Sequence, residues 1–178
     1  PLLPGFGLAD ETSGLMGAFL ALTALRERDQ ISGKGQVVEF AIYEPLLTLL
    51  GPQVVDYDQL GIIQKRDGSR LPFTAPRNTY QTRDNKWVSI SGSAQSTFER
   101  MCDALGIKEL IYDQRFLNNR LRIKNSKVLD EFLQKAILDF DQENLIQLFD
   151  QFGAAIAACN NIAEIFKDKH IKSRKNII

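Results

Sequence analysis

The stretch GKGQVVEFAIYE, residues 33–44, decides how the first part of this sequence folds. Its two glycines favour a turn, because glycine adopts turn conformations at little cost. The run at 36–42 is then almost continuously apolar, which predicts a strand buried on both faces of a parallel or mixed sheet. The turn and the strand together predict an α/β fold rather than a purely helical one.

Helices are predicted on both sides of this stretch. Residues 9–29 carry apolar side chains at helical spacing, with Asp10 in a position that suits an N-cap. Small and apolar residues widen its apolar face, so its first turns are expected to be buried nearly all round. A second helix is predicted over 43–60, with a kink or break at Gly51 and Pro52.

The remaining residues predict a small α/β domain. Residues 61–76 are rich in turn formers and are interpreted as a linker between segment 1–60 and domain 77–178. A hairpin is expected with its turn at residues 84–85, Trp87 and Ser89 facing one side and Val88 and Ile90 the other. Helices at about 95–105, 122–139, 141–152 and 161–170 and a strand at 154–159 complete the domain.

Composition excludes several classes of function. Hydrophobic residues make up 44% and charged residues 25%, and 22 Lys and Arg balance 22 Asp and Glu. This balance argues against nucleic acid and anionic membranes as partners, and no apolar run is long enough for a membrane helix. The opening residues resemble no signal peptide and include no initiator Met, so a cytoplasmic protein that begins inside a longer chain is expected. Cys102 and Cys159 are interpreted as reduced and buried.

Familiar catalytic motifs are absent from the sequence. There is no dinucleotide-binding fingerprint, Walker loop or serine nucleophile elbow. No metal site is expected, because the single histidine, His170, lies in a polar stretch without ligand partners. The charged run from Arg120 to Lys127 is interpreted as a solvated helix face.

Several stretches, taken in order, resemble the family III (CaiB/BaiF-type) coenzyme A transferases. They are LADETSGLM at 8–16, GKGQVVE with AIYE at 33–44, APRNTYQTRD at 75–84, DQRF at 113–116, and GAA to NNIAE at 153–164. The set covers nearly the whole chain. The resemblance implies that residues 1–60 belong to a large Rossmann-like CoA-binding domain and 77–178 to the small domain. It also implies a central fragment of an interlocked homodimer.

The resemblance makes Asp10 the catalytic nucleophile of a CoA transfer between an acyl-CoA and a carboxylic acid. Coenzyme A would be a substrate, with no permanently bound cofactor. Residues alone allow Asp10 to be only a helix cap, and Glu11 is the neighbouring alternative. Gly92, Ser93, Ala94 and Gln95 match a glycine-rich loop over the active site, but only Gly92 is glycine, so a plain strand-to-helix connection stays open.

Two other functions remain open at this point. The family also hosts α-methylacyl-CoA racemases, in which Asp10 would act with a histidine from a segment not in this sequence. The chain could instead be inactive alone and serve as a folding or dimerisation unit, which exposed apolar surface at 15–25 would favour.

Overall fold

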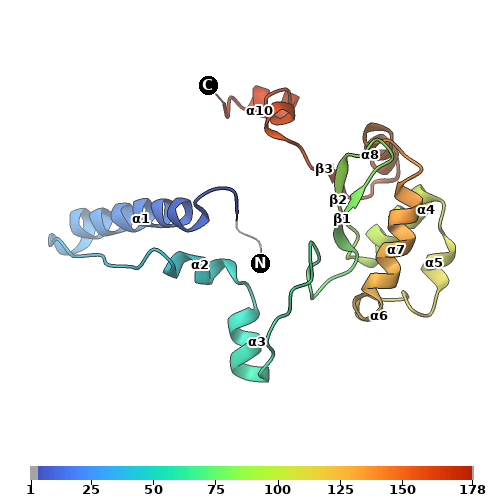
Figure 1. Ribbon diagram of the computed structural model, residues 1–178. Helices are drawn as coiled ribbons and strands as arrows, with labels where there is room; N and C mark the ends of the chain where they lie inside the picture. Colours follow the sequence, from blue (N-terminus) through green and yellow to red (C-terminus); the bar gives the residue numbers. More distant parts are fainter. Residues whose placement is uncertain (1–3, 178) are drawn as a thin grey trace. The chain divides into compact units, whose positions relative to one another are not determined.

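The computed structural model describes residues 4–177, which form two compact units divided between Lys65 and Arg66 (Figure 1). The first unit is helical, and α1 (Leu8–Glu27) continues into a short π-helix at Arg28–Ser32. Its other helices are α2 (Glu44–Leu49) and α3 (Gln53–Leu60). The predicted break at Gly51 and Pro52 is confirmed, because it separates these two helices.

The predicted strand at 36–42 is wrong for the chain as it stands. No residue of this segment has strand structure, and Val37 is 92% exposed. A strand forms only where a neighbouring strand pairs with its backbone groups, and none of the described residues before Arg77 forms a strand. The apolar segment at 36–42 is therefore suited to burial, but no strand within the described part of this unit covers it.

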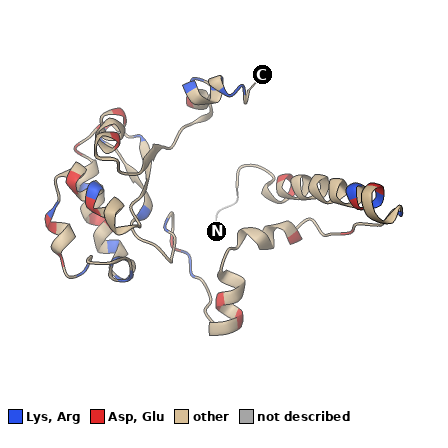
Figure 2. Cartoon of the chain, turned by 180° about the vertical axis from the view of Figure 1, so that it is seen from behind, with Lys and Arg blue, Asp and Glu red and all other residues tan. Residues whose placement is uncertain are grey.

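The first turns of α1 are also more exposed than the sequence predicts. Leu15 is 77% exposed, and Phe19 and Leu22 are exposed as well. Figure 2 shows that the charged residues of α1 are confined to its two ends, so the middle presents apolar side chains. The described residues of the first unit thus leave an apolar surface of the kind that marks an interaction site.

The second unit contains a three-stranded antiparallel sheet in the order β1-β2-β3, formed by Arg77–Gln81, Trp87–Ser91 and Ile156–Ala158. The predicted hairpin is confirmed, with Tyr80 opposite Val88. Asn85 adopts a φ of 59° at its turn, which asparagine tolerates better than most residues. Val88 and Ile90 are fully buried while Trp87 is half-exposed, as the alternation predicts.

Helices cover the buried face of this sheet (Figure 1). They are α4 (Gln95–Leu105), α5 (Glu109–Tyr112), α6 (Asn119–Lys124), α7 (Ser126–Ile137) and α8 (Gln142–Phe152). Two short helices follow β3, α9 (Ile162–Ile165) and α10 (Lys169–Ser173). The helix predicted at 122–139 is divided at Asn125, and Gly106 and Gly153 end α4 and α8 at positive φ.

The core of the second unit is formed by the apolar faces of α4, α7 and α8 against the sheet. Its fully buried side chains include Phe98, Met101, Leu129, Leu133, Leu145 and Phe149. The free edge of β1 is also covered, because the Gln134 side chain accepts from the Gln81 N–H at 3.0 Å and donates to the Gln81 carbonyl at 2.8 Å. This amide imitates a neighbouring strand and satisfies edge groups that would otherwise be unpaired.

The two cysteines differ in accessibility, so the expectation that both are buried is wrong for Cys159. Cys102 is buried in α4, and its burial raises the pKa of the thiol to about 12, whereas Cys159 is exposed.

Since the thiolate is the reactive form, a thiol reagent at pH 8 should label Cys159 rapidly and Cys102 only on unfolding. Mass spectrometry of briefly labelled chain should find a single adduct, and equal labelling of both would contradict this burial.

Candidate functional site

Asp10 lies one turn further into α1 than an N-cap does. The N-cap is Gly7, so Asp10 is the third helical residue and the expectation of a capping aspartate is wrong. A β-carbon at Gly7 would come within 2.7 Å of the Asp10 Oδ2 atom. Glycine therefore leaves room for this carboxylate, which folds back toward the beginning of the helix.

The Asp10 carboxylate is exposed, and among the described residues it has neither a hydrogen-bond partner nor an ion pair. The unpaired N–H groups and the dipole of a 20-residue helix favour an anion in the first turn. Glu11 shares this turn and is also exposed, so the local geometry alone does not separate the two carboxylates.

The turn that carries Asp10 is fastened to the stretch at 33–44. Ser13, which is buried, donates its hydroxyl hydrogen to the Ile42 carbonyl at 2.6 Å. The backbone N–H of Ala41 donates to the Glu44 carboxylate at 2.7 Å, which fixes the entry to α2. Two sequence stretches that carry the family resemblance are therefore brought together around the beginning of α1.

The loop Gly92–Gln95 connects β2 to α4 in the second unit. Gly92 is buried, and its N–H donates to the Pro76 carbonyl at 2.9 Å. Ala94 is the N-cap of α4 and has no side-chain capping bond, while the Ser93 hydroxyl is the one buried side-chain polar atom without a partner in the described part of the chain. The loop and Asp10 belong to different units, so their meeting in one active site is a proposal.

Gly92 is required by space rather than by backbone conformation. A β-carbon there would lie 3.0 Å from the Pro76 Cγ and 3.4 Å from the Met101 sulfur. Gly92→Ala should therefore destabilise the second unit by about 1–2 kcal/mol, because tight packing must give way. Denaturant unfolding followed by the fluorescence of Trp87, the single tryptophan, measures this change. Ser96→Ala, an exposed neighbour, is the control, and an unchanged midpoint for Gly92→Ala would contradict the packing.

Arg122 is the residue of this region that the sequence analysis misplaced. The charged run at 120–127 was expected to be solvated, yet the Arg122 side chain is fully buried. It donates to the carbonyl of Ser93 and to the side chain of Gln95, so it contacts the candidate loop directly.

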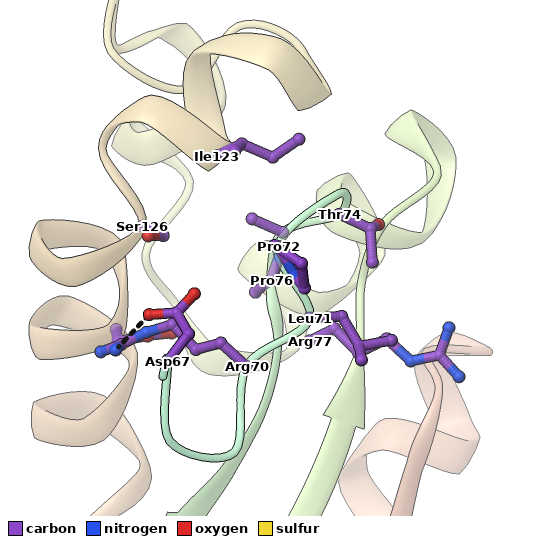
Figure 3. A pocket seen from close by; sticks show the side chains of 11 residues that line it. Asp67, Arg70, Leu71, Pro72, Thr74, Pro76, Arg77, Ile123 and Ser126 are labelled. Carbon is purple, nitrogen blue, oxygen red and sulfur yellow. Dashed lines mark hydrogen bonds and ion pairs between the residues drawn. The ribbon is translucent and has the colours of Figure 1, made fainter. Parts of the chain in front are cut away.

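A small cavity beside the loop region is structural rather than catalytic (Figure 3). It has a volume of about 90 Å³, too small for an acyl-CoA, and lies between the chain at Asp67–Arg77 and helices α6 and α7. The Arg70 guanidinium is already paired with Asp130, whose other carboxylate oxygen accepts from the Tyr80 hydroxyl at 2.5 Å. The hydrogen bond to Asp130 raises the Arg70 pKa, and burial raises that of Tyr80, so both keep their protons.

Between residues 4 and 177, no three His, Cys, Asp or Glu side chains are grouped as metal ligands, and His170 is exposed in α10. None of the helices in that part of the chain has the length and apolarity needed to cross a membrane.

Comparison with protein families gives a match along the whole sequence. The model described as CoA-transferase family III matches residues 1–178. Succinyl-CoA–D-citramalate CoA-transferase of Chloroflexus aurantiacus is 33% identical over the whole chain, which covers 44% of that protein. The beta subunit of succinyl-CoA–L-malate CoA-transferase from the same bacterium is 29% identical, again over 44% of its length. The chain thus spans under half the length of these relatives.

Solved structures show the same relationship. A CaiB/BaiF family protein from Brucella suis superposes with a TM-score of 0.79 at 28% identity, covering 98% of this chain and 46% of that one. A protein from Mycobacterium tuberculosis superposes with a TM-score of 0.83, and its 23% identity supports the fold alone.

Proposed function

The chain belongs to CoA-transferase family III, and on this premise we propose that it is the central part of a longer enzyme that transfers coenzyme A from an acyl-CoA to a carboxylic acid, with Asp10 as the nucleophile. One observation carries the proposal: within a chain that matches the family along its whole length, Asp10 stands in the stretch at 8–16 that resembles the family's nucleophile segment, and its carboxylate is exposed and unpaired among the described residues. A structural carboxylate at this third helical position would be expected to accept the backbone N–H of the N-cap residue, and Asp10 does not. A nucleophile has to keep its oxygens free.

The chemistry that we infer for Asp10 needs no proton transfer. Its carboxylate attacks the thioester carbonyl and the carbon–sulfur bond breaks. The CoA thiolate departs, and the acyl group is now joined to Asp10 as a mixed anhydride. The thiolate then attacks the Asp10 carbonyl, which releases the donor acid and forms an aspartyl-CoA thioester. The acceptor carboxylate repeats both steps in reverse, and Asp10 is restored. One difficult exchange becomes a series of easier ones, each beginning and ending with one anion.

The loop Gly92–Gln95 is proposed to border the same site. Each carbonyl attack places negative charge on an oxygen, which backbone N–H groups can stabilise if they are already oriented. The uncapped beginning of α4 offers such groups next to Ala94. We propose that this loop meets Asp10 in a cytoplasmic homodimer, with coenzyme A as a substrate and no permanently bound cofactor.

Succinyl-CoA is the first donor to test. Relatives at 33% and 29% identity are named as transferases that use succinyl-CoA with a hydroxy-dicarboxylic acid. The complete protein should therefore be incubated with succinyl-CoA and a panel of di- and monocarboxylic acids, and new CoA thioesters identified by mass spectrometry. Formation of a new thioester together with free succinate supports the proposal.

The same incubation in deuterated water addresses the racemase alternative. If deuterium enters the α-position of a 2-methylacyl-CoA and no coenzyme A is exchanged between acids, the protein is a racemase, which transfers a proton at carbon, and the proposal of CoA transfer fails. The 178-residue chain should be inactive in both assays, because it supplies under half of the length of its relatives.

A further inference from the structure

The Arg122 side chain reaches from α6 to three separate segments of the second unit. Its Nε donates to the Ala75 carbonyl at 2.9 Å, and one terminal nitrogen donates to the Phe116 carbonyl at 3.1 Å and to Gln95 Oε1 at 2.7 Å. Its other terminal nitrogen donates to the Ser93 carbonyl at 2.8 Å. The guanidinium also stacks on the Phe98 ring, 4.4 Å from its centre.

We propose that Arg122 is a positioning residue: it holds the loop Gly92–Gln95 as a fixed wall of the active site, so that the loop does not open as a mobile lid. The part of this proposal that concerns catalysis rests on the function proposed above. The part that concerns the loop rests on contacts within the second unit alone.

The bonding of Arg122 is specific to arginine. In the described residues no carboxylate forms an ion pair with it, so neutral oxygens from the backbone and Gln95 satisfy a buried charge. The guanidinium fork aims donors in several fixed directions, whereas a lysine ammonium is one point on a flexible chain. Opening the loop would leave donors of the buried guanidinium unpaired, which is costly, so the loop has a strong preference for this one conformation.

The same contacts limit movement of the loop from both sides. Arg122 binds Ser93 in the loop and Gln95 at its end, and it also binds Ala75. Pro76, the next residue, accepts the Gly92 N–H, so the other end of the loop is fastened to the same segment. Opening the loop would break bonds at Gly92, Ser93 and Gln95 together. The Gln95 side-chain oxygen likewise accepts one of these bonds.

Hydrogen exchange in the complete protein tests whether Arg122 holds the loop. In Arg122→Lys, the amides of Gly92 and Phe98, which are hydrogen-bonded here, should exchange at least about tenfold faster, while α8 keeps its protection. Arg115→Lys is the matched control, because Arg115 stacks on Phe116 but, within residues 4–177, its side chain donates hydrogen bonds to Asp113 alone. Unchanged exchange at Gly92, or an equal increase throughout the second unit, would overturn the proposal.

Kinetics test whether this holding matters for the reaction. A small displacement of a positioned group slows chemistry more than binding, so kcat of Arg122→Lys should fall about 10- to 100-fold with little change in KM for the acyl-CoA. If the Gly92 and Phe98 amides of Arg122→Lys exchange faster while kcat per folded protein is unchanged, Arg122 has no positioning role in the reaction. If the unaltered protein shows no transfer, the proposed function fails, and hydrogen exchange still decides whether Arg122 holds the loop.

A milder variant covers the case in which Arg122→Lys does not fold. Gln95→Leu removes one of the four hydrogen bonds and leaves the buried guanidinium with its three backbone partners. Exchange at Phe98 should then increase more than in Arg115→Lys, while α8 keeps its protection. No increase in Gln95→Leu would contradict the proposal in the same way.

Discussion

Asp10→Asn should reduce CoA transfer by the complete protein at least about 1,000-fold, because removal of a covalent nucleophile leaves only binding and orientation. An amide has nearly the same shape as a carboxylate but cannot form the anhydride. The midpoint of thermal unfolding should change only slightly, by the same amount as in Glu11→Gln, because the Asp10 side chain is exposed, has no bonding partner among the described residues and stabilises the helix only through its charge. Steady-state rates and unfolding midpoints are measured on the same preparations.

Glu11→Gln is the matched control for this experiment. It removes one charge from the same first turn of α1, one residue away, so any general effect of charge at the helix terminus appears in both variants. Its activity should stay within about threefold of the unaltered protein. A large loss of activity in Glu11→Gln, with Asp10→Asn still active, would show that the nucleophile is Glu11 and that the assignment to Asp10 is wrong.

The second large effect concerns the stability of the second unit. Asp130 is buried and accepts hydrogen bonds from the Tyr80 hydroxyl, the Asn78 amide and the Arg70 guanidinium. Asp130→Ala leaves a buried hydroxyl and a half-buried cation without their partner, so unfolding should become easier by about 3–5 kcal/mol. Trp87 lies in β2, which pairs with the strand that carries Asn78 and Tyr80, and its fluorescence in denaturant reports the change in the 178-residue chain.

Two variants separate the network from charge in general. Asp130→Asn keeps an oxygen for the Tyr80 hydroxyl and should cost less than Asp130→Ala. Asp141→Asn breaks an exposed ion pair with Arg83 and should change stability by under about 1 kcal/mol. Equal losses of unfolding free energy for Asp130→Ala and Asp141→Asn would show that the buried network stabilises the unit no more than an exposed ion pair does.

The sequence predicted the second unit well because that unit buries its own apolar residues. The alternation at Val88 and Ile90 and the helical spacing of Leu129 and Leu133 correspond to contacts within the unit. The same reasoning failed at 36–42, where the pattern is apolar but the described first unit has no strand to pair with it. A hydrophobic pattern shows that a segment is suited to burial and does not reveal which surface covers it.

The local structure around the candidate residues was predicted in part, and their roles remain proposals. Asp10 was placed near the beginning of a helix, but the helix begins at Leu8, because boundaries are set by local geometry that the pattern does not show. Arg122 was missed because a charged residue in a charged run is usually solvated. The spacing of Arg122 from Leu129 and Leu133 gives no reliable signal either, because the chain is divided at Asn125 and these residues lie on two different helices.

The most direct test is to trap the covalent intermediate. The complete protein is incubated with succinyl-CoA or another productive donor, treated with hydroxylamine and digested, and the modified residue is located by mass spectrometry. A hydroxamate on Asp10 that forms only with an acyl-CoA is the predicted result, because hydroxylamine attacks both the anhydride and the aspartyl thioester. An active protein that gives no hydroxamate at Asp10, or one that carries it on Glu11, would contradict the account.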